Sequence, residues 1–105
     1  MERVINTNPM SPYIEITLNI KGNCRIKFHA YLDTGSTISL CLPNVLPNEY
    51  WKYDSKKIVT ATTAGGNKVI YSKYATQVPF LISFREVFVD TIYMSTTIGC
   101  DILLG

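Results

Sequence analysis

The sequence predicts an all-β domain, a small closed or semi-closed β-barrel, and three observations lead to this prediction. Apolar and polar residues alternate with a period of two over several segments, which indicates strands buried on one face. Turn-forming residues separate these segments. No segment shows a helical period of ten residues or more, so at most one short helix is expected. The 105 residues suffice for a single domain with one core.

The clearest alternation lies near the N-terminus, in residues 14–20 and again in residues 24–30. Between them, Lys21-Gly22-Asn23 supplies residues that tolerate a positive φ. This pattern predicts a β-hairpin whose second strand continues to Leu32. The alternation places His29 on the polar face, so we interpret it as a solvated strand residue rather than a catalytic base.

Residues 38–42 form a short apolar segment typical of a strand. Pro43 and Pro47 then interrupt regular structure, because proline lacks the backbone N–H that a ladder or helix needs. Residues 48–52 are long enough for one helical turn and no more. We therefore expect this region to connect strands.

A second hairpin is predicted between residues 57 and 75. β-branched residues and tyrosine are frequent in 57–63 and 68–75, and Ala64-Gly65-Gly66-Asn67 lies between them as a glycine-bearing tip. By itself the glycine pair favours an ordinary hairpin turn. Residues 77–93 carry a further strand signal, which is expected to be interrupted at the polar pair Arg85-Glu86.

The composition argues against several other classes of protein. The net charge is +2 and the basic residues are scattered, so a nucleic-acid surface is not expected. No apolar run approaches the roughly 20 residues of a membrane span, and the N-terminus does not resemble a secretory signal. The three cysteines have no Cys-x-x-Cys spacing and there is one histidine, so we expect reduced thiols and no structural metal.

One unusual segment, residues 31–37, places Asp33-Thr34-Gly35 at the end of an apolar strand. In isolation this tripeptide is more typical of an aspartate that starts a turn. Here a hairpin precedes it, a glycine-tipped hairpin follows about 30 residues later, and Ile102-Leu103-Leu104-Gly105 ends the sequence. This ordered set resembles the retropepsins, the retroviral-type aspartic proteases, and most of all those of plant pararetrovirus polyproteins. The resemblance covers residues 13–105.

The resemblance implies a role for each residue of the central segment. Asp33 would be the catalytic aspartate, and Thr34 would hydrogen-bond across a dimer interface. Gly35 would allow close approach of backbone and substrate, while Ser36 and Thr37 would line the substrate-binding strand. Many retroviral members carry an acidic residue at the position of Thr37, so the contact with substrate backbone is expected to be uncharged here.

The resemblance also assigns the two segments that follow. The hairpin of residues 58–74 would be a flap over an extended peptide substrate, and its tip would consist of Ala64, Gly65, Gly66 and Asn67. The last residues would pass behind the active-site loop and support it: Ile102, Leu103, Leu104 and Gly105.

The sequence contains one Asp-Thr-Gly, and no other acidic residue stands in a second copy of the motif. The second catalytic aspartate is therefore expected from another copy of the chain, which a twofold homodimer would place opposite the first. The two carboxylates would share one proton and activate water without a metal or a cofactor. The implied function is an endopeptidase that cleaves a viral polyprotein in the host cytoplasm or the viral particle.

Family members usually continue beyond the Ile-Leu-Leu-Gly segment into a helix and a final strand at the dimer interface. The sequence stops at Gly105, so two explanations are open: it is a shortened piece of the protein, or dimerisation uses other contacts, such as an N-terminal arm of residues 1–12. Two alternatives stay open. One is a protease-like barrel without activity that binds peptides or associates with itself, and the other is a cysteine hydrolase using Cys41, for which no base is placed.

Overall fold

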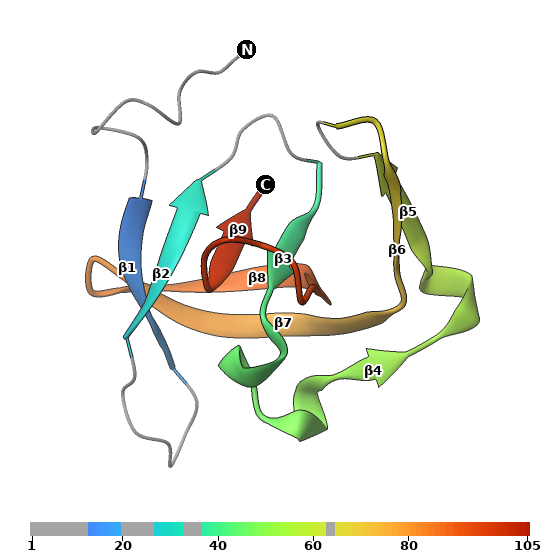
Figure 1. The fold of residues 1–105 in the computed structure, drawn as a ribbon. Coiled ribbons are helices and arrows are strands. Elements are labelled where there is room, and N and C mark those ends of the chain that lie inside the picture. Colours follow the sequence, from blue (N-terminus) through green and yellow to red (C-terminus); the bar gives the residue numbers. More distant parts are fainter. Residues whose placement is uncertain (1–12, 20–26, 33–36, 63–64) are drawn as a thin grey trace.

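The computed structural model describes residues 13–19, 27–32, 37–62 and 65–105 (Figure 1). Within these residues the regular elements are strands and single 3-10 turns, which confirms the all-β prediction. The strands are β1 Tyr13–Leu18, β2 Lys27–Leu32, β3 Ser39–Cys41, β4 Lys52–Tyr53, β5 Val59–Thr62, β6 Lys68–Tyr71, β7 Lys73–Ile82, β8 Arg85–Met94 and β9 Ile102–Leu104. The 3-10 turns are η2 Pro43–Val45, η3 Asn48–Tyr50 and η4 Ser55–Lys57.

Six of these strands close into a barrel, as predicted. They follow the order β1-β2-β9-β3-β8-β7, and β1 pairs with β7 to complete the circle. One edge of β7 serves two partners, because β1 pairs near Phe80 while β4 pairs with Lys73 and Tyr74 at the other end. Closure removes the free sheet edges that would otherwise need protection.

The first predicted hairpin is confirmed as β1 and β2, which pair antiparallel with Ile16 opposite Phe28. Ile16 is buried while Glu15 and His29 are exposed, as the period-two alternation requires. The predicted turn at Lys21-Gly22-Asn23 lies outside the described residues.

The second predicted hairpin is confirmed as β5 and β6, which form a separate two-stranded sheet. The predicted extent of its second strand, 68–75, is wrong. β6 ends at Tyr71, and β7 begins at Lys73 because Tyr74 and Ala75 are buried and pair with β8. One apolar, β-rich run thus divides between two sheets, which local propensity does not reveal.

The position predicted for the break between the last long strands is also wrong. The turn lies at Ser83 and Phe84, whose φ angles are +51° and +66°. Arg85 and Glu86 belong to β8 and pair with β7, since exposed polar side chains are compatible with a ladder. Two-residue hairpin turns of this kind usually carry Asn-Gly or Asp-Gly, so Ser-Phe gave no turn signal.

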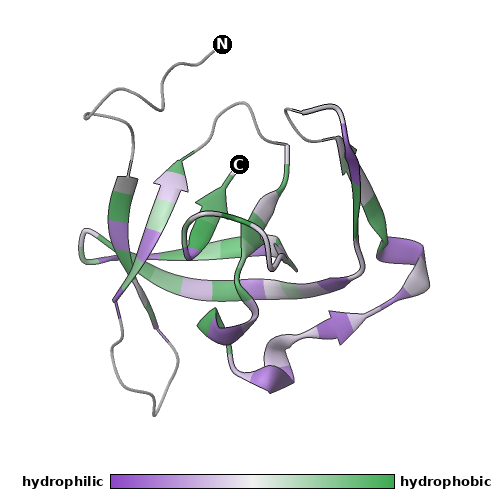
Figure 2. Ribbon diagram, viewed as in Figure 1, coloured by the Kyte–Doolittle hydropathy of each residue, from purple (hydrophilic) through white to green (hydrophobic). Residues whose placement is uncertain are grey.

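Two clusters of buried residues form the core. The larger one fills the barrel, and every barrel strand contributes to its fully buried members: Ile16, Ala30, Cys41, Ala75, Val78, Phe80, Ile92 and Ile102. The smaller one lies where the β5–β6 hairpin meets the barrel, and consists of Leu40, Tyr71, Tyr74 and Tyr93. We refer to its three tyrosines as the tyrosine cluster. Figure 2 shows the hydrophobic colouring of β9 and the hydrophilic colouring of β4.

Candidate active site

The predicted catalytic segment, Asp33-Thr34-Gly35-Ser36, lies outside the described residues, and so does Ala64 of the predicted flap tip. The structure describes the strands on both sides of the segment. Leu32 ends β2, while Thr37 and Ile38 precede β3. Strands β2, β9 and β3, which we call the frame, hold these flanking residues.

The central element of this frame is β9, which lies between β2 and β3 (Figure 1). It runs parallel to β2, with Leu104 opposite Leu32, and antiparallel to β3, with Leu103 opposite Leu40. The backbone N–H of Gly105 donates to Ser39 Oγ at 3.2 Å. The strands before and after Asp33 are thus joined by ladder hydrogen bonds to one common strand.

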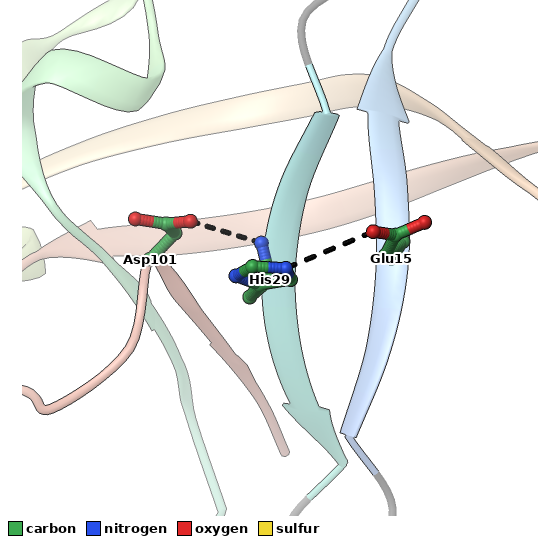
Figure 3. A network of polar contacts seen from close by, with 3 residues as sticks. All are labelled: Glu15, His29 and Asp101. Carbon is green, nitrogen blue, oxygen red and sulfur yellow. Dashed lines mark hydrogen bonds and ion pairs between the residues drawn. The ribbon is translucent and has the colours of Figure 1, made fainter.

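Asp101 adds a second connection at the start of β9. Its carboxylate Oδ2 accepts a hydrogen bond from the backbone N–H of His29 at 2.9 Å (Figure 3). Its backbone carbonyl accepts from the N–H of Leu42 at 3.0 Å. One residue therefore links β2 to the end of β3, which agrees with a structural role for this carboxylate.

His29 lies on the outer face of β2, where its Nε2 is 3.8 Å from Glu15 Oε2 on β1 (Figure 3). The His29 side chain is half exposed to solvent. Its expected place on the polar face is therefore confirmed. The pair is a cross-strand contact on the surface, worth little in stability.

The β5–β6 hairpin contacts this frame through the smaller core cluster. Val59, Ala61 and Val69 of the hairpin pack against the same cluster as Ile38 and Leu103. A continuous set of apolar contacts therefore joins the hairpin to the residues that follow the predicted catalytic segment. Gly66 has a φ of +85°, a conformation in which glycine is favoured. Gly65, Gly66 and Asn67 are exposed.

Several large apolar side chains near the frame are exposed. Tyr31 and Leu32, directly before Asp33, are each more than a third exposed. Ile70 on β6 is 67% exposed. Singly exposed apolar side chains are common on protein surfaces, so their exposure by itself assigns these residues no role.

The cysteine hydrolase alternative is contradicted by Cys41. Its side chain is fully buried on β3, and burial raises the pKa of the thiol from 9.0 to about 12. A nucleophilic cysteine must be ionised and accessible, and Cys41 is neither at neutral pH. Burial also raises the pKa of Cys100, whose Sγ donates to the Ile102 carbonyl at 3.1 Å. Cys24 lies outside the described residues.

Metal ligands do not gather in the part of the chain that the structure describes, where no group of three or more His, Cys, Asp or Glu side chains could hold an ion. In the same residues, no helix has the length and apolar character that crossing a membrane would require.

Comparison with known proteins identifies the family. Residues 8–105 match the family described as Cauliflower mosaic virus peptidase (A3). The chain belongs to this family. Relatives include the enzymatic polyproteins of cauliflower mosaic virus strain BBC (32% identical, 99% of this chain), carnation etched ring virus (29%, 94%) and figwort mosaic virus strain DxS (28%, 94%). In each case the chain spans 15% of the polyprotein.

The family match confirms the resemblance to pararetrovirus proteases. Residues 31–42 and 99–105 carry this resemblance most clearly. A resemblance to the protease of rice tungro bacilliform virus in particular stays a prediction. The predicted site residues all lie within the matched span, and their roles also stay predictions.

Sequence reasoning missed the tyrosine cluster. Its members are distributed over β6, β7 and β8, and no motif connects them.

Proposed function

We propose that the chain is an aspartic endopeptidase that cleaves a viral polyprotein, with Asp33 of two copies forming one active site. The observation that carries the proposal is the position of β9. The chain belongs to a viral peptidase family, and its strand β9 pairs with both strands that flank the single Asp-Thr-Gly of the sequence. A frame built from ladder hydrogen bonds suits a site whose two carboxylates must be held close together.

The chemistry follows from the proximity of the two Asp33 carboxylates. At a separation of about 3 Å both cannot ionise readily, so they share one proton. The ionised carboxylate takes a proton from water, and the water oxygen attacks the scissile carbonyl carbon while the protonated carboxylate donates to the carbonyl oxygen. Thr34 would join the two loops across the dimer, and Gly35 would leave room for the substrate.

The substrate would be an extended peptide. β5 and β6 form a two-stranded sheet, so each has an edge without a ladder partner among the described residues. Such an edge can pair with peptide backbone, while exposed apolar residues such as Ile70 contact the side chains. Ser36 and Thr37 would line the substrate-binding strand, and residues 102–105 would support the active-site loop.

A second copy of the chain is the proposed partner. One Asp-Thr-Gly in 105 residues provides only half of the dyad. The exposed Tyr31 and Leu32 supply apolar surface directly beside Asp33, where a partner would contact it. The active dimer would act within a polyprotein in the host cytoplasm or the viral particle.

The decisive experiment compares Asp33→Asn with Asp90→Asn at mildly acidic pH, on a peptide from the chain's own polyprotein. Asp90 is exposed and accepts a hydrogen bond from Gln77 at 2.8 Å, so its replacement is a matched control. Asp33→Asn should abolish cleavage and Asp90→Asn should retain it. Pepstatin should inhibit cleavage by both the wild type and Asp90→Asn.

Mixing the wild-type and Asp33→Asn chains tests whether two copies share one active site. An excess of the Asp33→Asn chain should suppress wild-type cleavage, because mixed dimers hold one intact carboxylate. Cleavage that survives Asp33→Asn would sink the proposal. Peptide binding without any cleavage would favour the non-catalytic barrel instead.

A further inference from the structure

Tyr93 occupies a junction between the barrel and the β5–β6 hairpin. It lies on β8, opposite Leu40 of β3 on one side and Tyr74 of β7 on the other. Its ring centroid is 6.5 Å from that of Tyr71 and 6.2 Å from that of Tyr74, in tilted arrangements. These distances are within the range of favourable aromatic pairs.

The Tyr93 hydroxyl reaches the other stem of the hairpin. It donates to the backbone carbonyl of Lys57 at 3.2 Å. Lys57 ends η4, two residues before β5 begins, and thus precedes the first ladder pair of the hairpin, Val59 with Tyr71. The same side chain therefore contacts the incoming stem through its hydroxyl and the outgoing stem, at Tyr71, through its ring.

Lys57 makes a second contact between the hairpin stem and the tyrosine cluster. Its Nζ lies 5.5 Å from the centroid of the Tyr74 ring, within the range of a cation–π contact. The three tyrosines are each 7–8% exposed, so the rings pack tightly while their polar ends can reach the surface. Elsewhere the hairpin leaves Ile70 exposed.

We propose that Tyr93 is a positioning residue of the flap, holding both stems of the β5–β6 hairpin so that the flap is presented to the substrate. This rests on the proposed function, in which the hairpin is the flap. Leu40, the neighbour of Tyr93 on β3, also pairs with Leu103 of β9. Tyr93 thereby connects the flap stems to the frame on which Asp33 depends.

The role differs from ordinary core packing because the hydroxyl and the ring act on different stems. Tyr93→Phe removes only the hydroxyl, and Tyr93→Leu also removes the ring contacts. Tyr53→Phe deletes a hydroxyl from a tyrosine on β4 that is 63% exposed, and serves as the matched control. Barrel packing is left intact by the Phe variants.

The test combines amide hydrogen exchange with cleavage kinetics on the full chain. In Tyr93→Phe, amides of β5 and β6 should exchange about five-fold faster, as expected for one net hydrogen bond. Amides of β2 should stay within two-fold of wild type. KM for the polyprotein peptide should rise by at most this factor while kcat changes less than two-fold, since a smaller fraction of chains presents a closed flap. Tyr93→Leu should show larger changes in the same direction.

Three outcomes would overturn the proposal. The first is exchange of β5 and β6 in Tyr93→Phe that equals exchange in Tyr53→Phe. The second is an equal acceleration of exchange in β2. The third is an unchanged KM despite faster exchange in the hairpin. A wild-type chain that cleaves nothing would contradict the proposed function. In that case, faster amide exchange confined to β5 and β6 in Tyr93→Phe would still support the inference that Tyr93 holds both stems of the hairpin.

Discussion

The barrel and the β5–β6 hairpin are stabilised in different ways. The barrel closes on itself, and its core side chains from six strands are almost wholly excluded from water. The hairpin has two strands of four residues, and it is joined to the barrel by the tyrosine cluster, one tyrosine hydroxyl and one lysine. A large buried core thus maintains the scaffold, while a small apolar cluster and a few directional contacts hold the element that we propose to move.

The largest expected effect is a loss of free energy of unfolding that differs between a substitution in the barrel and one in the hairpin. Phe80→Ala, in the barrel core, should lower the free energy of unfolding by about 3–5 kcal/mol, because it removes a large buried ring and leaves a cavity. Ile70→Ala, on the exposed face of the hairpin, should change it by less than about 0.5 kcal/mol. Urea denaturation of both variants measures the difference. Equal losses would contradict the division into scaffold and attached hairpin.

A pH effect on stability is expected in the barrel core. The pKa of Cys41 is raised to about 12 in the folded chain, so the native state keeps the proton that the unfolded state releases above pH 9.0. The stability that Cys41 contributes is complete below that pH and is lost as pH rises toward 12, by at most about 4 kcal/mol.

Urea denaturation of wild type and Cys41→Ala between pH 8 and 11 measures this effect. The stability advantage of wild type should shrink as pH rises. A constant difference across this range would show that Cys41 titrates alike in both states.

The smallest effect concerns the hairpin. Lys57→Met keeps an apolar stem but removes the charge above Tyr74, and should cost about 0.5–1 kcal/mol in local stability of the hairpin. Lys56→Met is the matched control, because Lys56 is exposed and its backbone N–H, which donates to Asp54, is unchanged. Amide exchange in β5 and β6 should increase for the first variant only. An equal response to both would assign the effect to net charge.

Most strands could be predicted from the sequence because side-chain alternation is a local signal. Glu15 and His29 face solvent while Ile16 is buried, as their spacing requires. The break at Ser72 and the turn at Ser83 and Phe84 could not be predicted, since both depend on which strands pair. Tyr74 favours a strand in either sheet, and only pairing with β8 assigns Tyr74 and Ala75 to β7.

The all-β class, the two hairpins and the single Asp-Thr-Gly that pointed to a viral peptidase follow from local sequence patterns. Three further features follow from the folded chain: β9 lies between β2 and β3, the Asp101 carboxylate accepts from the His29 N–H, and Tyr93 contacts both stems of the hairpin. The physical reason is distance along the chain. Asp101 and His29 are 72 residues apart, and Tyr93 and Lys57 are 36 apart. Contacts of this kind have no local pattern, and they exist only once the barrel has closed.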